Sequence, residues 1–193
     1  MWDTTTYSAL RHRLPRLTPW LCACLLTPVP HSMAGQESNV GFRAAFQPEW
    51  DSAARRLDQL AEAIPEKTYG WRPSAGVRSV SEAIMHVAAA NFSLAAALGS
   101  SQPDDLPKDP EKIVDKAEVL RLLRRSFEHL GEAMERVLEG DLDQAPPKDG
   151  TTAKGRFGDG RRVLLRALAH SNEHRGQLVA YARMNGVVPP WSR

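Results

Sequence analysis

The chain has 193 residues, of which 42% are hydrophobic and 25% charged. This composition is typical of a globular protein with one good core, and it excludes intrinsic disorder and collagen-like structure. The formal net charge is +2, but without Arg11, Arg13, Arg16 and Asp3 near the N-terminus the totals are 22 basic and 22 acidic residues. Because nucleic acid binding depends on clustered basic residues, this neutral body predicts no DNA or RNA partner.

The first 34 residues have the order of a secretory signal peptide. Basic residues precede an apolar run over residues 17–29, and the small residues Ser32 and Ala34 suit the positions that signal peptidase recognises. The run has 13 residues and contains two prolines, so it is too short for a permanent membrane span, which takes about 20 residues. We therefore expect a signal peptide over residues 1–34 with cleavage near Ala34, one domain over residues 35–193, and a periplasmic or extracellular location.

Two other interpretations of this segment stay open. It can be a disordered or amphipathic tail with a chance apolar patch, and Leu21 to Cys24 faintly resembles a lipoprotein cleavage box, although few apolar residues precede it. The two cysteines of the chain, Cys22 and Cys24, both lie in the apolar run. Cleavage after Ala34 would leave a mature chain without cysteine, and therefore without a disulfide, a thiol nucleophile or a thiolate metal ligand.

Apolar residues follow one face of a helix in two segments of the first half of the chain. The first helix is expected over about residues 41–64, where Pro48 either kinks the helix or marks its first turn. The second is expected to begin after a cap at Ser79 or Ser81 and to end at Gly99. Their core stripes contain Phe46, Trp50, Ala53, Leu57, Leu60 and Ile64, and then Val80, Ile84, Val87, Asn91, Leu94 and Leu98.

Two more helices are expected in the second half of the chain. The third ends at Gly140, and a loop over residues 141–160 that looks flexible separates it from the fourth, which ends at Asn185 and Gly186. Their stripes contain Leu120, Leu123, Phe127, Leu130, Met134 and Val137, and then Val163, Ala167, His170, His174, Gln177 and Tyr181. Four helices without a convincing strand predict an all-α fold, an antiparallel four-helix bundle, and the long loops leave the order of its connections open.

Histidine occurs twice on the core stripe of the fourth helix. His170 and His174 are four residues apart, so their Cβ atoms lie roughly 5 to 6 Å apart on one helical face and can grip one metal ion. His86 lies on the second helix between Ala83 and Ala90, which are small enough to leave room beside its ring. Three neutral imidazoles would leave a fourth position for water or substrate, as in catalytic zinc sites. The pattern therefore predicts a divalent metal site at these three histidines.

Histidines at this spacing also occur by chance, as hydrogen-bonded core residues or at the edge of a bundle. Asn91 and Gln177 lie on the stripes of the second and fourth helices. Because buried amides need polar partners, they favour a polar pocket shared by these two faces, unless the fourth stripe leaves the core near Gln177. Asn91 is then a candidate for orienting substrate. His129 has charged neighbours in the sequence and is predicted to be a solvated surface residue.

Two glutamates adjoin the predicted site. Residues 170–174 read HSNEH, which matches the inverted zinc-peptidase motif, but no acidic residue follows Glu173 to supply the third ligand that such peptidases take from downstream. Glu173 is therefore predicted to support a ligand from outside the coordination sphere or to face solvent. Glu82 lies four residues before His86 and is either a candidate acid or base or a cap of the second helix. No catalytic residue is assigned.

Four segments of the chain carry family motifs in register: FQPEW at residues 46–50, YGWRPSAGVRS at 69–79, HVAAAN at 86–91 and HSNEHRGQLVAYARMNGVVPPW at 170–191. Together they resemble the DinB-like (damage-inducible, YfiT-like) superfamily of four-helix bundles, over about residues 42–192. The last segment is the most specific, because its histidine pair, its RGQL and its closing GVVPP occur in register.

This resemblance implies an up-down-down-up bundle that holds one divalent metal ion, commonly zinc or nickel, through three histidines. These correspond to His86, His170 and His174. Characterised relatives include S-transferases that use low-molecular-weight bacterial thiols, a thiol-dependent isomerase and metal-dependent hydrolases, and they are often homodimers. Since bacterial thiol cofactors belong to the cytoplasm, the export signal of this chain argues against thiol transfer.

These features together predict an exported DinB-like metal-dependent enzyme that acts on a small molecule, either as a hydrolase or as a thiol S-transferase. The alternative is a non-catalytic bundle that binds a metal or a small ligand, or that dimerises. This alternative stays open because the sequence places no acid or base firmly beside the metal.

Overall fold

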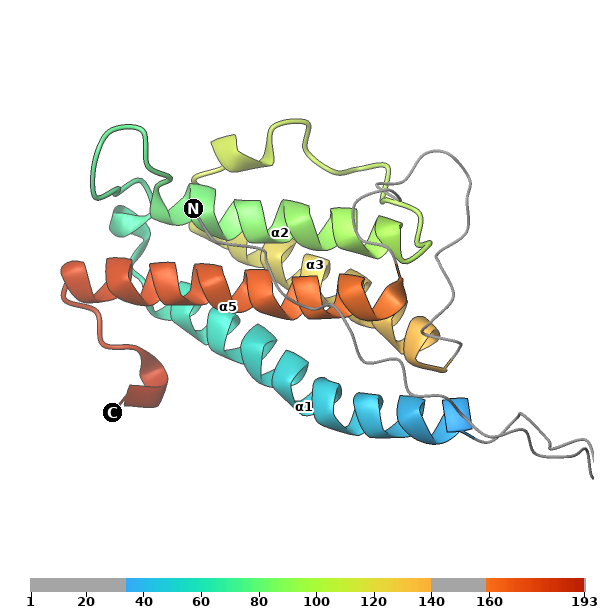
Figure 1. The fold of residues 1–193 in the computed structure, drawn as a ribbon. Coiled ribbons are helices and arrows are strands. Elements are labelled where there is room, and N and C mark those ends of the chain that lie inside the picture. The colour runs from blue at the N-terminus through green and yellow to red at the C-terminus, as the bar shows by residue number, and fades with distance from the viewer. Residues whose placement is uncertain (1–33, 140–158, 193) are drawn as a thin grey trace, which may run out of the picture. The chain divides into compact units, whose positions relative to one another are not determined.

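The computed structural model describes residues 34–139 and 159–192 (Figure 1). Four α-helices make up most of them: α1 (Ala34–Ala63), α2 (Val80–Ala97), α3 (Lys116–Glu139) and α5 (Gly160–Met184). Three short 3-10 helices accompany them: η1 (Glu66–Thr68), η2 (Pro110–Lys112) and η3 (Pro190–Ser192). Within these two described ranges there is no strand, which confirms the predicted all-α class.

The four helices run in the order up, down, down, up. α2 and α3 run the same way, and α1 and α5 run the opposite way (Figure 1). α2 packs on α3 and α5, and α1 packs on the same two helices from the other side, so the four close around one core. The parallel pair α2 and α3 is joined by a linker over residues 98–115, which runs back along the bundle and carries η2 against α2.

Each helix contributes apolar side chains to the core at the expected spacing. Fully buried examples are Leu57 and Leu60 of α1, Ile84 and Val87 of α2, Leu123 and Leu130 of α3, and Val163 and Leu164 of α5. Burying one such side chain stabilises the fold by about 1.5 to 3 kcal/mol. α2 is also long and apolar enough to cross a membrane by length and composition, but 67% of it is buried inside the bundle. Its apolar character is therefore explained by its place in the core.

The start of the first helix differs from the expectation. α1 begins at Ala34 rather than near Gly41, so Pro48 lies inside the helix and does not mark its first turn. A proline within a helix removes one backbone hydrogen bond. Here Phe46 and Trp50 flank the proline and are 4% and 3% exposed, so their packing in the core holds this turn in place.

The ends of α2 and α5 follow the capping rules. Ser79, and not Ser81, is the N-cap of α2. Asp159 caps α5 by accepting a hydrogen bond from the backbone N–H of Arg162 at 2.9 Å. α5 ends at the predicted place, and Gly186 follows with a φ of +72°, in the left-handed region that favours glycine. Residues 141–158 of the predicted loop lie outside the described part of the chain.

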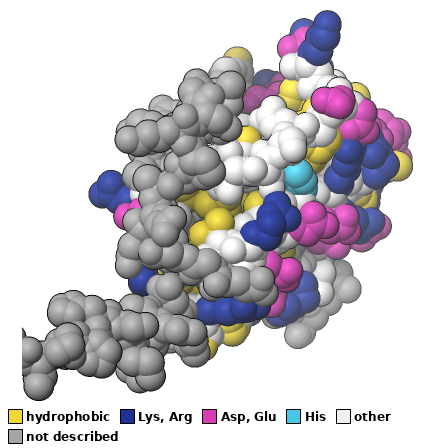
Figure 2. Space-filling view, turned by 90° about the vertical axis from the view of Figure 1, so that its right-hand side faces the viewer, with side chains coloured by type: hydrophobic (Ala, Val, Ile, Leu, Met, Phe, Trp, Pro, Cys, Tyr) yellow, Lys and Arg dark blue, Asp and Glu magenta, His cyan; other side chains and the backbone are white. Residues whose placement is uncertain are grey.

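Acidic and basic side chains lie next to one another on the face of the molecule shown in Figure 2. Ion pairs join α3 to α1 (Arg124 with Asp58 and Glu62) and α3 to the linker (Arg125 with Asp105), and a further pair lies within α3 (Arg121 with Glu118). Exposed pairs of this kind contribute at most about 1 kcal/mol each. Their effect is mainly to balance the surface charge locally.

Candidate metal centre

Three histidines bring their rings together between α2 and α5. One ring nitrogen each from His86, His170 and His174 lies within 4.8 Å of the other two. The ring centroids are 4.6 Å apart for the two histidines of α5, and 5.0 and 5.2 Å from those to His86. His170 and His174 are buried, whereas the side chain of His86 is 30% exposed. The group can therefore hold a metal ion, and its solvent-accessible side is at His86.

The local structure of both helices explains this convergence. His170 and His174 are one helical turn apart and project from the same face of α5. α2 packs against α5, and its start is fixed two turns before His86 by a capping box. There Ser79 Oγ accepts from the backbone N–H of Glu82 at 3.2 Å, and the Glu82 carboxylate accepts from the backbone N–H of Ser79 at 2.8 Å.

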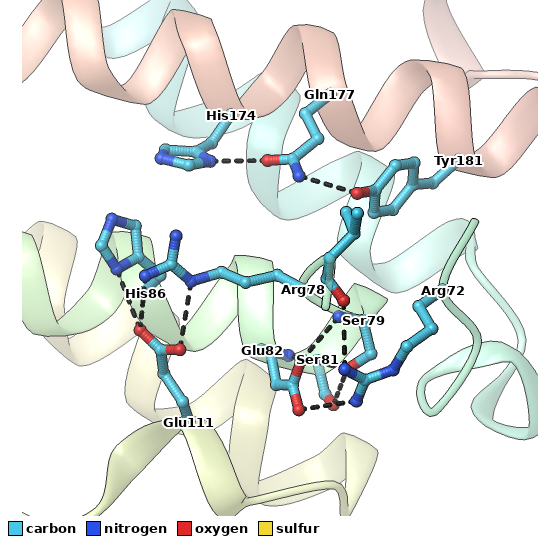
Figure 3. A network of polar contacts seen from close by, with 11 residues as sticks. Arg72, Arg78, Ser79, Ser81, Glu82, His86, Glu111, His174, Gln177 and Tyr181 are labelled. Carbon is cyan, nitrogen blue, oxygen red and sulfur yellow. Dashed lines mark hydrogen bonds and ion pairs between the residues drawn. The ribbon is translucent and has the colours of Figure 1, made fainter. Parts of the chain in front are cut away.

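A carboxylate from the linker supports His86 (Figure 3). Glu111, in η2, lies with Oε1 3.0 Å from Nδ1 of His86. Arg78 donates to the same carboxylate through Nε at 3.1 Å and Nη2 at 3.2 Å. Burial disfavours the charged form of Glu111, but these hydrogen bonds outweigh it and hold its pKa below the ordinary value. Because a carboxylate only accepts, Nδ1 of His86 is the donor in this contact, and Nε2 is the ring nitrogen left for a metal ion.

A second chain of hydrogen bonds holds His174 (Figure 3). Its Nδ1 lies 2.8 Å from Oε1 of Gln177, whose Nε2 donates to the hydroxyl of Tyr181 at 2.8 Å. With the amide in this orientation, Nδ1 of His174 is the donor. Nε2 of this ring is therefore also the nitrogen left for a metal ion. Hydrogen bonds of this kind fix the ring orientation of metal-binding histidines.

His170 completes a donor set that fits a divalent ion. Its Nδ1 is buried and has no hydrogen-bond partner in the described part of the chain. Burial of an unpaired polar atom is costly, and a bound metal ion would satisfy a free nitrogen of this ring. Three imidazole nitrogens suit zinc, nickel and similar metals.

Burial keeps the two α5 histidines neutral. Desolvation lowers the pKa of His170 to about 4, and nearby positive charge acts in the same direction. Desolvation also lowers the pKa of His174, although its hydrogen bond with Gln177 opposes the shift. Neutral imidazole is the form that binds metal ions, so both rings are in that form at neutral pH.

The other predicted site residues lie around this group rather than in it. Glu82 adopts the second of its two expected roles: it caps α2 and accepts from Nη2 of Arg72 at 2.7 Å. Hydrogen bonds from the backbone of Ser79, opposed by desolvation, and from Arg72 lower its pKa. Its carboxylate is therefore committed to the cap. Glu173 is exposed, in line with the expectation that it faces solvent.

For Asn91, which was expected in a polar pocket between α2 and α5, the structure gives a hydrogen-bond partner on α3. This side chain is fully buried, and its Nδ2 donates to Ser126 Oγ of α3 at 3.1 Å. Gln177 instead serves His174, as described above. Helical spacing identifies a buried face but does not tell which neighbouring helix each position contacts. The spacing therefore could not show that Asn91 and Gln177 have different hydrogen-bond partners.

His129 is also less solvated than expected. It is half-buried on α3, its ring centroid lies 5.6 Å from that of Phe92, and its Nε2 is buried without a hydrogen-bond partner among the described residues. The charged neighbours in sequence point elsewhere because they occupy other positions around α3. Unlike the other three histidines of the domain, His129 is not part of the group that can hold a metal ion.

Glu111 and Arg78 are the residues of the site that sequence reasoning missed. Glu111 lies in a polar, proline-bearing linker, where no periodicity shows which residue faces the bundle. Arg78 lies just before the cap of α2. The one signal in the sequence is that this linker must return along the bundle if α2 and α3 are parallel, which brings some of its side chains past α2.

The comparison with protein families agrees with the motifs and with the geometry. A family model described as the DinB superfamily matches residues 49–178, which is more than half of the chain and includes all three histidines. No curated protein matches the chain. With an up-down-down-up bundle and a three-histidine group in place, the match settles the family: the chain belongs to the DinB superfamily.

Proposed function

We propose that this chain is a metal-dependent enzyme in which His86, His170 and His174 hold one divalent ion, with zinc and nickel the preferred candidates. The observation that carries the proposal is the convergence of three ring nitrogens within 4.8 Å, two from α5 and one from α2. The hydrogen bonds to Nδ1 of His86 and His174 support it, because they leave Nε2 of both rings available.

The donor set supports a catalytic rather than a purely structural ion. When bound by three imidazoles, a divalent ion keeps a coordination position for water or substrate and supplies Lewis acidity to it. The chain contributes two buried, neutral histidines, His170 and His174, and the half-exposed, positively charged Arg78 beside them. Hydrolysis and thiol transfer both suit such a site, and the expected export of the protein favours hydrolysis.

The carboxylates near the three histidines are engaged in other contacts, which argues against their acting as a general acid or base. Among the described residues, Glu111 is the carboxylate that contacts a histidine of the group, and both its oxygens are engaged by Arg78. Glu82 is engaged at the cap of α2. These commitments support a second candidate function, a bundle that binds a metal or a small ligand without catalysis.

Cobalt substitution distinguishes these two functions. If the site is open, a thiol or a hydroxamate added to the cobalt-loaded protein should coordinate the ion and change its d–d absorption spectrum, because three histidines leave a position free. A spectrum that ignores every small ligand tried, or that shows a fourth protein ligand, would favour the binding protein. An open site would justify a screen of ester, amide and thiol-acceptor substrates.

We also propose that the protein is exported, on the strength of the basic, apolar and small-residue order of residues 1–34. Expression in a bacterial host should give a mature protein outside the cytoplasm that begins near residue 35. N-terminal sequencing and mass spectrometry of the fractionated protein measure this directly. Recovery of the intact chain from the cytoplasm would contradict the proposal, and a lipidated Cys22 or Cys24 would favour the lipoprotein alternative.

A further inference from the structure

We propose that Glu111 is a positioning residue that raises the metal affinity of the centre by holding the ring of His86. Glu111 lies in the linker between α2 and α3, which supplies none of the three proposed metal ligands. The inference rests on the proposed metal site at the three histidines.

The geometry of the contact is specific. Oε1 of Glu111 lies 3.0 Å from Nδ1 of His86, on the side of the ring away from a metal bound at Nε2. A carboxylate in this position fixes the tautomer, restrains rotation of the ring and increases the basicity of the nitrogen that binds the metal. These three effects all strengthen metal binding.

Arg78 in turn holds Glu111. Its Nε and Nη2 contact the two carboxylate oxygens at 3.1 and 3.2 Å, which is a bidentate arrangement. Arg78 immediately precedes Ser79, the N-cap of α2, so the start of α2 and the linker are tied together at the site. The carboxylate therefore has a defined orientation although its side chain is 40% exposed.

His86 is the ligand that most needs such support. Its side chain is 30% exposed, whereas His170 and His174 are 6% and 9% exposed as residues and are restrained by packing. His174 also has Gln177 as an acceptor. For His86, Glu111 is the hydrogen-bond partner that the described structure provides.

The coupling works in both directions, as linkage requires. If Glu111 favours metal binding at His86, metal binding must favour the contact between Glu111 and His86. Two backbone N–H groups report on this part of the linker: Lys112 N–H donates to Asp109 O at 3.1 Å, and Ile113 N–H donates to Pro110 O at 3.1 Å. We expect their hydrogen exchange to slow when zinc binds.

The test compares zinc affinities measured by competition with a chromophoric chelator. Glu111→Ala should weaken binding by about 10- to 100-fold, the usual effect of losing such a partner. Glu111→Gln should weaken it less, because the amide oxygen still accepts from Nδ1 but carries no charge. Asp109→Ala is the matched control: it removes a carboxylate from the same linker whose ion pair, with Lys112, is exposed, and it should leave the affinity unchanged.

The outcomes separate this inference from the proposed function. A wild-type chain that binds no metal contradicts the proposed site itself. Wild-type affinity in both Glu111 variants, with the wild type binding zinc, overturns only the role of Glu111. The role of Glu111 is also overturned if the metal-free Glu111 variants have lower thermal stability but unchanged zinc affinity. The residue would then stabilise the fold without affecting metal binding. Zinc-dependent protection of the linker that is lost in Glu111→Ala supports the proposal.

Discussion

Replacing any one of the three histidines with alanine should abolish metal binding. We expect the purified wild-type domain to bind about one divalent ion per chain, and His86→Ala, His170→Ala and His174→Ala to bind close to none. Two remaining imidazoles do not complete a protein site for zinc, which takes at least three protein ligands in catalytic centres. Elemental analysis after dialysis against metal-free buffer gives the stoichiometry.

His129→Ala is the matched control for this experiment. His129 is also partly buried and also has a buried ring nitrogen without a hydrogen-bond partner in the described structure. The variant therefore removes an imidazole from the interior without touching the metal-binding group, and it should keep its metal. Equal metal content in the wild type and in the three ligand variants would show that these are ordinary core histidines.

The helical framework could be predicted from the sequence because each helix carries a one-sided apolar stripe. Leu57 and Leu60, or Leu123 and Leu130, lie on the buried faces that their spacing indicates. Spacing also placed His170 and His174 on one face of α5, where the structure has them. Periodicity within a helix thus indicates both the core positions and two of the three histidines of the group.

Periodicity does not reveal which helices pack against each other. The remaining contacts of the site could therefore not be predicted from the spacing of apolar residues. Asn91 lies on a predicted core stripe, yet its partner is Ser126 on α3 and not a group on α5. The direction of α3 relative to α2 came from the family resemblance, since the spacing of apolar residues is the same for parallel and antiparallel neighbours. The long linker that parallel helices need is what brings Glu111 to His86.

Where the sequence leaves two roles open for one side chain, the contacts of the folded chain decide between them. Glu82 was expected either to serve as an acid or base or to cap α2, since one glutamate three residues after a serine is compatible with both. The capping geometry and the ion pair with Arg72 decide for the cap. The glutamate that contacts the site is Glu111, and no sequence pattern in its linker identifies it.

The metal-free protein should lose stability as the pH falls from 7 to 5. Burial lowers the pKa of His170 to about 4 in the folded chain, against an unfolded value of 6.5. Below pH 6.5 the unfolded chain therefore binds the additional proton and the folded chain does not, so the free energy of unfolding falls until about pH 4. This histidine alone accounts for about 2 kcal/mol between pH 7 and 5. Urea unfolding in the presence of a chelator measures the slope.

A comparison with one variant makes this prediction specific to the centre. His170→Ala should show a smaller loss of stability between pH 7 and 5 than the wild type, because it lacks the histidine whose pKa burial lowers. The carboxylates with lowered pKa values, such as Glu82 and Glu111, lose their stabilising charge only as the pH falls below about 4.5. They therefore contribute little in this window, and equal slopes in wild type and His170→Ala would contradict the account. Added zinc should raise stability most at pH 7 and progressively less toward pH 5, because protons compete with the metal for the same ring nitrogens.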